Sequence, residues 1–331
     1  MDGETISQKG MIFIINYYIG IDGGGTNCRL IAVDEQLNQI LAIDGGSTNT
    51  ASNTLVSVSE TFNRLFSLLF SQHGLTKEGC LGLCIGNSGL DNEASFKKIN
   101  NIIDKVGFSC PITIVNDGVI ALASATRGNP GVIIISGTGS IAYGLDTDGN
   151  IIRCGGWGPM FDAIGSGYWI GKEALKHAFY AYDGRGPDTV LTQVIKEAFY
   201  ITDLPDCLEQ LYGEKALNKA DIAKIAIEVE QGAQVYGDAV CMQILNEAAD
   251  GLVKMANAVL KRTGTLSKHI TVSGGCILNN AYLFDVFTRK INEIYPTAYI
   301  NKLEHEPVWG AIYLAVQSNT YVESVGEETE I

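Results

Sequence analysis

Two stretches decide the fold: YYIGIDGGGTNCRLIAV at residues 17–33 and VIIISGTGSIAYGL at residues 132–145. Each has the pattern of an apolar strand, a glycine-rich loop and a second strand. A turn and a third strand follow in both places, at 40–43 and at 151–153. This repetition of one supersecondary unit predicts a duplicated chain in which each half contributes a glycine loop.

The apolar periodicity outside these stretches predicts the remaining elements. In the first half they are a helix over 55–73, a strand over 81–85, a helix over 93–106, a strand over 112–115 and a helix over 119–126. In the second half a helix-rich segment over about 160–265 precedes a strand over 270–272, a helix over 279–294, a strand over 298–300 and a helix over 308–317. The order predicts an α/β fold whose two related domains face each other across a cleft.

The same pattern gives the domain boundaries. Residues 1–10 are polar and are expected to be a disordered extension. We expect an N-terminal domain over 11–128, completed by a C-terminal helix at about 306–320. A C-terminal domain with a helical insertion is expected over 129–305.

Composition restricts the class of function. The 331 residues carry a net charge of -14, which disfavours nucleic acid and anionic membranes as partners. We expect no signal peptide, because the apolar run at 11–15 is too short for one, and no run is long enough to span a membrane. Its eight cysteines lack zinc-site spacing and mostly lie in apolar runs, which is typical of buried free thiols in a reducing compartment. We therefore expect a cytoplasmic protein.

The first glycine loop is a candidate phosphate-binding element. Asp22 ends the first strand, and Gly23, Gly24, Gly25 and Thr26 follow. Three glycines exceed what a tight hairpin needs, and their backbone N–H groups can approach a phosphate closely. The Asp22 carboxylate can hold Mg²⁺ through water, and the Thr26 hydroxyl can donate to a phosphate oxygen. On its own, an ordinary glycine turn explains the loop equally well.

A second and a third glycine element change this balance. Gly137, Thr138 and Gly139 form a loop at the equivalent place in the second half, which suggests that two loops hold one polyphosphate. No Walker lysine follows either loop, and a strand rather than a helix follows each, which excludes the dinucleotide fingerprint. Further on, Gly274 and Gly275, with Asn279, separate a strand from a helix, where a flat ring could lie against the backbone. A closely packed strand–helix turn is the alternative for this third element.

In this order and spacing, the three glycine elements resemble the phosphate-1, phosphate-2 and adenosine motifs of the actin/hexokinase/Hsp70 superfamily. In detail they resemble its BadF/BadG/BcrA/BcrD branch and the N-acetylglucosamine kinases within it. The resemblance covers about residues 18–175 and 270–315. It implies duplicated ribonuclease H-like, actin-like ATPase domains around a central cleft, with ATP and Mg²⁺ as cofactors. It also implies transfer of the γ-phosphate to an amino sugar, with N-acetylglucosamine as the favoured acceptor and its 6-phosphate as the product. The kinases that the chain resembles are commonly dimers, so the resemblance is compatible with a homodimer.

Asp117 is the candidate catalytic base. Phosphoryl transfer to a hydroxyl needs a carboxylate that receives the proton and holds the nucleophile in line. Asp117 follows an apolar strand and precedes a helix, so its position alone is equally typical of a helix cap. The resemblance favours the catalytic role, because the family carries its base in an equivalent aspartate.

The resemblance also indicates a sugar-binding set. Asn49, within Ser-Thr-Asn, and Trp157, within Gly-Gly-Trp-Gly, match family segments that contact the sugar. The full set assigned to the sugar is Asn49, Ser140, Gly156, Trp157, Gly158 and Asp162. The chain departs from the family at one point, since the family's sugar-contacting aspartate falls on Ala163 and its neighbouring glutamate on Ile164. Asp162 either substitutes for that aspartate or the sugar preference differs.

Two other functions remain open from the sequence. One is an ATPase activator of a radical dehydratase, although the cysteines here are scattered. The other is a non-catalytic sugar-sensing regulator, which the short polar N-terminus and the acidic charge disfavour. Among kinases, glucosamine and N-acetylmuramic acid remain alternative acceptors.

Overall fold

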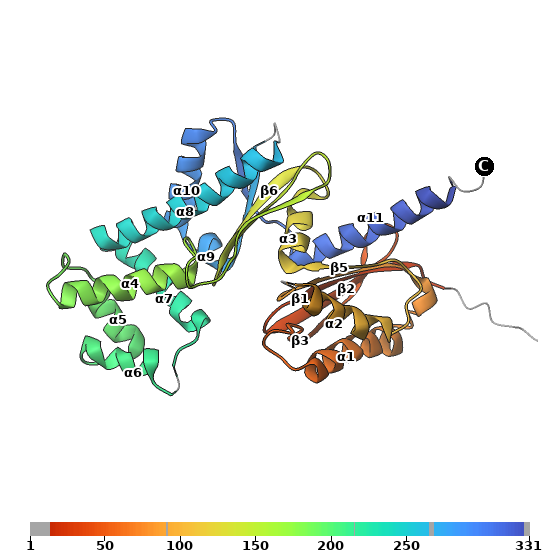
Figure 1. Cartoon of the computed structure of the whole chain (residues 1–331), viewed down its shortest axis with the longest axis horizontal. Helices are drawn as coiled ribbons and strands as arrows, with labels where there is room; N and C mark the ends of the chain where they lie inside the picture. The colour runs from red at the N-terminus through yellow and green to blue at the C-terminus, as the bar shows by residue number, and fades with distance from the viewer. Residues whose placement is uncertain (1–13, 91, 215, 265–267, 328–331) are drawn as a thin grey trace, which may run out of the picture. The chain divides into compact units, whose positions relative to one another are not determined.

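The computed structural model describes residues 14–90, 92–214, 216–264 and 268–327. The chain divides into two compact units (Figure 1). The first unit runs to Ser124 and resumes at Glu306, and the second spans Ala125–His305. The extension expected at residues 1–10 lies outside the described residues.

The first unit is built on one mixed sheet. Its strands are β1 (Tyr17–Gly23), β2 (Asn27–Val33), β3 (Gln39–Gly46), β4 (Cys80–Asn87) and β5 (Ile112–Asn116). Their order in the sheet is β3-β2-β1-β4-β5. The meander β1–β2–β3 is antiparallel, whereas β4 runs parallel to both β1 and β5. The carboxyl ends of β1, β4 and β5 therefore meet at one edge of the sheet.

Helices cover both faces of this sheet, as Figure 1 shows, with α1 and α2 on one face and α3 and α11 on the other. Their bounds are α1 (Leu55–His73), α2 (Glu93–Asp104), α3 (Asp117–Thr126) and α11 (Pro307–Glu327), and a 3₁₀ turn covers Lys77–Gly79. Alternation along β1 sends Tyr17, Ile19 and Ile21 into the first core and Tyr18 into the second. Glycines at 20 and 82 allow α11 to pack closely, because a Cβ there would lie within 2.8 Å of its backbone carbonyls.

The second unit repeats this topology. Its strands are β6 (Gly131–Ser136), β7 (Ser140–Leu145), β8 (Ile151–Gly155), β9 (His269–Ser273) and β10 (Tyr299–Lys302). Their order is β10-β9-β6-β7-β8, which is the first sheet read from its other edge. The pairing directions also match, with an antiparallel β6–β7–β8 meander and β9 parallel to β6 and β10. The duplication predicted from the glycine loops is confirmed.

The helices of the second unit form one continuous core with its sheet. They are α4 (Gly167–Tyr182), α5 (Leu191–Phe199), α6 (Cys207–Tyr212), α7 (Lys219–Gln234), α8 (Ala239–Thr263), α9 (Gly275–Leu278) and α10 (Ala281–Ile294), with a 3₁₀ turn over Leu204–Asp206. None of the helices in the described part of the chain combines the length and the hydropathy of a membrane span.

Two helix predictions need correction. The helix expected over 279–294 begins two residues later, at Ala281, because the Asn280 side chain accepts from the Leu283 N–H at 2.7 Å and caps α10; the short helix α9 before it was not predicted. The helix expected over 308–317 is longer, since α11 runs from Pro307 to Glu327. The described strands lie where they were predicted, with ends that differ by one or two residues, except that β3 runs to Gly46, three residues beyond the predicted end.

Candidate functional site

Two carboxyl groups come together at the carboxyl edge of the first sheet. Asp22 lies near the end of β1, and Asp117 begins α3 immediately after β5. Burial, followed by the charges of Asp117 and Glu306, raises the pKa of Asp22 from 3.8 to about 6. Two carboxylates that repel each other in a partly buried place form a hard oxygen donor set, which suits a divalent cation such as Mg²⁺.

The nearby Arg29 does not cancel this negative charge. Arg29 lies opposite Asp22 in the β1–β2 register. Its guanidinium instead pairs with Glu306 at 3.3 Å and with Asp44 at 3.5 Å. The pKa of Asp22 is consequently raised despite an arginine on the adjacent strand.

The hydrogen bonds at the start of α3 indicate whether Asp117 is needed as a helix cap. Because α3 begins at Asp117, the N-cap position belongs to Asn116. The Gly118 N–H donates to Asn116 Oδ1 at 3.0 Å and to Asp117 Oδ1 at 2.9 Å. Asn116 therefore supplies a cap acceptor, and helix formation does not depend on the Asp117 carboxylate alone.

The first glycine loop is fastened to two neighbouring polar segments. The Gly24 carbonyl accepts from the Thr48 N–H at 3.3 Å and from Ser47 Oγ at 3.1 Å. The Gly23 carbonyl accepts from the Ser88 N–H at 2.7 Å. Gly25 and Thr26 are exposed. The base of the loop is thus held firmly, while its tip keeps an accessible backbone.

A Cβ would have very different consequences at the individual glycines. At Gly23 it would lie 2.3 Å from both Thr48 Oγ1 and Asn87 Oδ1. At Gly25 its nearest neighbour would be Asn49 Nδ2, at 3.8 Å. Packing alone therefore requires glycine at 23, whereas packing does not require it at 25.

Asn49 lies beside this loop. A Cβ at Gly89 would be 2.6 Å from Asn49 Oδ1, so Asn49 is also close to the segment that follows β4. Thr48 and Asn87, whose side chains lie against Gly23, are fully buried. Neither Thr48 Oγ1 nor Asn87 Oδ1 has a hydrogen-bond partner among the described residues. The structure brings Asp22, the loop 23–26, Asn49 and Asp117 to the same unit.

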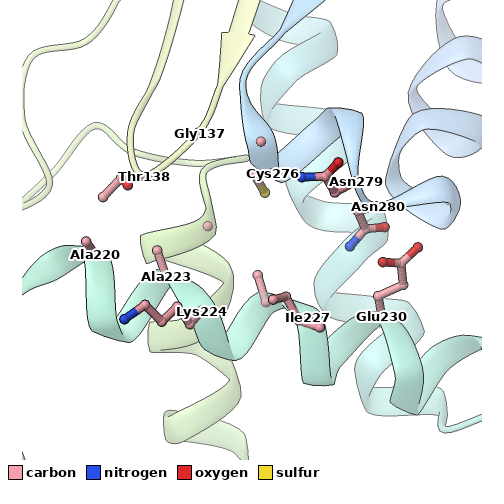
Figure 2. Close-up of a pocket in the computed structure, with 13 residues that line it drawn as sticks. Gly137, Thr138, Ala220, Ala223, Lys224, Ile227, Glu230, Cys276, Asn279 and Asn280 are labelled. Atoms are coloured by element: carbon pink, nitrogen blue, oxygen red, sulfur yellow. The ribbon is translucent and has the colours of Figure 1, made fainter. Parts of the chain in front are cut away.

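The second unit contains a cavity of about 300 Å³ (Figure 2). It is lined by the second glycine loop, the start of α4, one face of α7, the start of α9 and the residues between α9 and α10. The lining residues are Gly137, Thr138, Gly167, Ala220, Ala223, Lys224, Ala226, Ile227, Glu230, Gly275, Cys276, Asn279 and Asn280. Members of the predicted phosphate and adenosine elements, Gly137, Thr138, Gly275 and Asn279, are therefore brought together.

Backbone contacts hold the mouth of this cavity. The Gly137 carbonyl accepts from the Gly167 N–H at 2.8 Å, and the Thr138 carbonyl accepts from the Tyr168 N–H at 3.3 Å. Gly274 has φ +94°, and a Cβ there would lie 2.4 Å from the Ser136 carbonyl oxygen. Gly274 is thus required by the close approach of β6 and the β9–α9 turn, and Gly139 has open space around it. Neither of these two glycines lines the cavity.

The walls of the cavity combine apolar and amide groups. Figure 2 shows Ala220 and Ala223 on α7 facing Thr138, and Ile227 further along the same helix toward Asn279 and Asn280. Glu230 Oε1 accepts from the Ala281 N–H at 2.6 Å, and Lys224 pairs with Asp221 at 2.8 Å. An apolar wall beside amides and a glycine loop suits a flat heterocycle that carries a polyphosphate.

The contribution of α7 was missed in the sequence, where residues 160–265 were interpreted only as a helical insertion. A signal exists: Ala220, Ala223, Lys224 and Ile227 stand at the i, i+3, i+4 and i+7 positions of one helix face. Small residues on that face leave room for a ligand. The pattern is also typical of ordinary helix packing, so it indicates a ligand site only in combination with the glycine loop opposite this helix face.

Four of the residues assigned to the sugar, Gly156, Trp157, Gly158 and Asp162, lie in one tight exposed loop. Trp157 is 63 % exposed, and its backbone N–H donates to Asp162 Oδ2 at 3.0 Å. The Asp162 N–H donates to the Gly158 carbonyl at 3.0 Å, and Gly156 and Gly158 both have positive φ. The Arg153 guanidinium lies 4.3 Å from the centre of the Trp157 ring and donates to the Gly156 carbonyl at 2.8 Å. The indole is held in place at the surface rather than packed in a core.

Three neighbouring positions differ in their access to solvent. Ser140 is buried, and its hydroxyl donates to the Ile164 carbonyl at 2.9 Å. Ala163 is buried, whereas the half-buried Asp162 keeps access to solvent. A Cβ at Gly251 would clash with Ile164, which shows how closely Ile164 lies against α8. An aspartate at 163 would bury a carboxylate, so Asp162 is the better placed of the two positions to meet a sugar.

Comparison with known proteins agrees with this geometry. The sequence model of the BadF/BadG/BcrA/BcrD ATPase family matches residues 19–315. An N-acetylmuramic acid/N-acetylglucosamine kinase of Clostridium acetobutylicum is 33% identical over 303 residues, which are 91% of this chain and 98% of that protein. An N-acetyl-D-glucosamine kinase of Dictyostelium discoideum is 33% identical over 313 residues, with the same coverage of 91% and 98%.

Solved structures show the same fold. A Chromobacterium violaceum protein thought to be an N-acetylglucosamine kinase superposes with a TM-score of 0.72 at 24% identity, covering 91% of this chain and 99% of that one. A Thermus thermophilus ROK hexokinase superposes with a TM-score of 0.57 at 14% identity, covering 93% and 99%. At these identities the likeness concerns the fold alone.

Proposed function

The chain belongs to the BadF/BadG/BcrA/BcrD ATPase family, and we propose on this basis that it is an ATP-dependent kinase that phosphorylates an amino sugar, N-acetylglucosamine being the favoured acceptor. The likeness to curated amino-sugar kinases over nearly the whole chain carries the proposal. The two carboxyl groups at the edge of the first sheet and the cavity of the second unit supply the chemistry. The product expected for N-acetylglucosamine is the 6-phosphate.

Asp117 is proposed as the general base. Its carboxylate would accept the proton of the sugar hydroxyl as that oxygen becomes the nucleophile. The position after β5 is rigid, since β5 pairs with β4 in register and α3 follows at once. A base on a sheet edge keeps its orientation without a ligand, which favours in-line attack.

Asp22 is proposed as the group that holds Mg²⁺, directly or through water. The raised pKa of Asp22, caused by burial and then by Asp117 and Glu306, shows unbalanced negative charge where a cation would be favoured. Bound Mg²⁺ would supply positive charge to the phosphates of the nucleotide. Gly23, Gly24, Gly25 and Thr26 would give their backbone N–H groups and a hydroxyl to the same phosphates.

The nucleotide base and ribose are assigned to the cavity of the second unit. Ala223 and Ile227 would pack against the flat base, and Asn279 would hydrogen-bond to it or to the ribose. Gly137 and Thr138, which line the cavity, and the neighbouring Gly139 would bind phosphate oxygens, and Gly275 would admit the ring against the backbone, while Gly274 allows the preceding turn to pack against β6. Fixed backbone donors of this kind need no reorganisation when charge develops.

The acceptor sugar is assigned to Asn49 and to the loop that Asp162 closes. Asn49 would hydrogen-bond to a sugar hydroxyl, and Trp157 would pack against the apolar face of the ring. Gly156, Gly158 and Asp162 complete the set. Ser140 is proposed to act indirectly, because its hydroxyl already holds the Ile164 carbonyl.

A coupled assay of ADP release across an amino-sugar panel tests the proposal. The panel contains N-acetylglucosamine, glucosamine, N-acetylmuramic acid and glucose, each with and without Mg²⁺. We expect the highest kcat/KM with N-acetylglucosamine and a loss of about 10²–10⁴-fold in kcat for Asp117→Asn, with the KM values for both substrates retained. Absence of sugar-dependent ADP release with every acceptor would reject the kinase assignment, and unchanged turnover in Asp117→Asn would reject the assigned base.

A further inference from the structure

We propose that Cys80 and Cys110 form a dithiol site that a low-molecular-weight disulfide oxidises to an intramolecular disulfide and that a thiol reductant reopens. The pair lies in the first unit and takes no part in the proposed phosphoryl transfer. The inference is therefore independent of the proposed function.

The geometry of the two sulfur atoms carries the proposal. Cys80 Sγ and Cys110 Sγ lie 3.4 Å apart in a hydrogen-bonded contact. A disulfide bond needs about 2.05 Å between the sulfurs, so a small movement of the side chains suffices. All eight cysteines are free thiols within the described residues, and these two are the pair recorded there with their sulfurs in contact.

The backbone on both sides of the pair is already fixed. Cys80 is the first residue of β4, and Cys110 stands two residues before β5, its parallel neighbour. The Leu83 N–H donates to the Pro111 carbonyl at 3.0 Å, which ties the two strands together next to the cysteines. The sheet thus holds the two thiols near each other, and formation of the disulfide would not require the ordering of a mobile loop.

The two thiols differ in access and in acidity. Cys80 is buried, whereas Cys110 is half-buried and can meet a small oxidant. Contact with Cys80 lowers the pKa of Cys110, while contact with Cys110 and burial raise the pKa of Cys80. Cys110 is therefore the attacking sulfur and Cys80 the resolving one.

The chemistry proceeds by two exchanges. The Cys110 thiolate attacks one sulfur of an oxidised small disulfide such as oxidised glutathione, forms a mixed disulfide and releases one glutathione thiolate. Cys80 then loses its proton to solvent and attacks the Cys110 sulfur, which releases the second glutathione thiolate. The protein loses two electrons and two protons, and the small disulfide gains the two electrons.

The location of the Cys80–Cys110 disulfide predicts its effect on the stability of the protein. It would lie at the start of β4 and just before β5, whereas Asn87 and Asn116 end these strands next to the proposed catalytic edge. The cross-link would join residues 30 apart in sequence and restrict the unfolded chain. We expect oxidation to raise the thermal stability of the protein.

The test uses the full-length reduced protein incubated with oxidised glutathione, followed by intact mass and mapping of unreduced peptides. Loss of two hydrogen atoms, a Cys80–Cys110 linked peptide and a thermal midpoint raised by several degrees are expected, and all three should reverse with dithiothreitol. Cys110→Ser should abolish the three changes, whereas the control Cys154→Ser, which removes another half-buried thiol, should retain them.

Several outcomes would overturn the proposal. They are a stable glutathione adduct at Cys110 without the link, a linked peptide between other cysteines, and the same loss of hydrogen atoms in Cys110→Ser. Absence of any change in mass would also reject it. Cys80→Ala provides a second variant, in which oxidation should stop at the mixed disulfide on Cys110, so the test does not depend on one substitution folding well.

Discussion

Burial of Asp22, reinforced by the charge of the neighbouring Asp117, raises the pKa of the Asp22 carboxyl group to about 6. The folded state therefore holds the Asp22 proton more tightly than the unfolded state, where the pKa is 3.8. Ionised Asp22 costs folding free energy, and stability falls as the pH rises from about 4 through about 6. The ionised Asp22 carboxylate thus opposes folding at neutral pH.

The first prediction concerns this pH dependence. Asp22→Asn should stabilise the ligand-free protein at pH 7.5, with an upper limit of about 3 kcal/mol, because the neutral amide avoids the ionisation that burial opposes. The gain should disappear as the pH falls through about 6 to 4. Urea unfolding across this range measures it, with the exposed Asp188→Asn as the matched control. An equal gain at pH 4 and pH 7.5 would contradict the assignment.

The second prediction concerns Mg²⁺. If the cation is held at Asp22, it should relieve the charge repulsion and raise the thermal midpoint of the wild-type protein at pH 7.5. The rise should shrink at pH 5, where Asp22 is protonated, and should be absent in Asp22→Asn. Potassium chloride at equal ionic strength controls for screening. A Mg²⁺ response that survives Asp22→Asn would place the cation elsewhere.

The glycine loop of the first unit allows structure and function to be separated. Gly23→Ala should destabilise the protein by about 1–3 kcal/mol, because a Cβ would lie 2.3 Å from Asn87 and Thr48 side-chain oxygens. Gly25→Ala should leave stability unchanged, since its nearest neighbour would be 3.8 Å away, yet it should raise the KM for ATP by hindering the phosphate. Urea unfolding and steady-state kinetics on both variants decide this. An unchanged KM in Gly25→Ala would remove the phosphate role from the tip of the loop.

The strands and glycine loops could be predicted from the sequence because their signals are local. Apolar runs that stop at Asp22 or Ser136 and meet glycine carry the information within a few residues. The family and the duplicated α/β fold are confirmed on that basis. The helix α9 was missed because it is only four residues long, and α10 was predicted to begin at 279, two residues early, although the Asn280 cap marks its start at Ala281.

The candidate site was harder to predict where it depends on packing. The raised pKa of Asp22 depends on burial and on residues distant in sequence, Asp117 and Glu306, so no motif reveals it. The α7 wall faces a glycine loop more than eighty residues away in the chain. Roles that were assigned through family resemblance alone, such as those of Asn49 and Trp157, stay predictions.

The cavity of the second unit gives a further prediction. Ala223→Leu should fill part of its volume and raise the KM for ATP, while the KM for the sugar stays near the wild-type value, because Ala223 lines the cavity. Ala239→Leu places the same side chain at an exposed alanine outside the cavity and should leave both constants unchanged. If the two variants behave alike, the cavity does not hold the nucleotide.

The last prediction concerns Asp162 and the loop that carries Trp157. Asp162 Oδ2 accepts the Trp157 N–H at 3.0 Å, so the carboxylate both closes the loop and offers a second oxygen to a ligand. Asp162→Ala removes both functions and should raise the KM for the sugar with little change in the KM for ATP. Asp162→Asn separates them, because its carbonyl oxygen can still accept from Trp157 while the charge is lost. Near wild-type sugar kinetics in Asp162→Asn would mean that Asp162 only positions the loop, and a loss as large as in Asp162→Ala would mean that the charged oxygen contacts the sugar. Unchanged sugar kinetics in both variants would show that residues 156–162 are not part of the acceptor site.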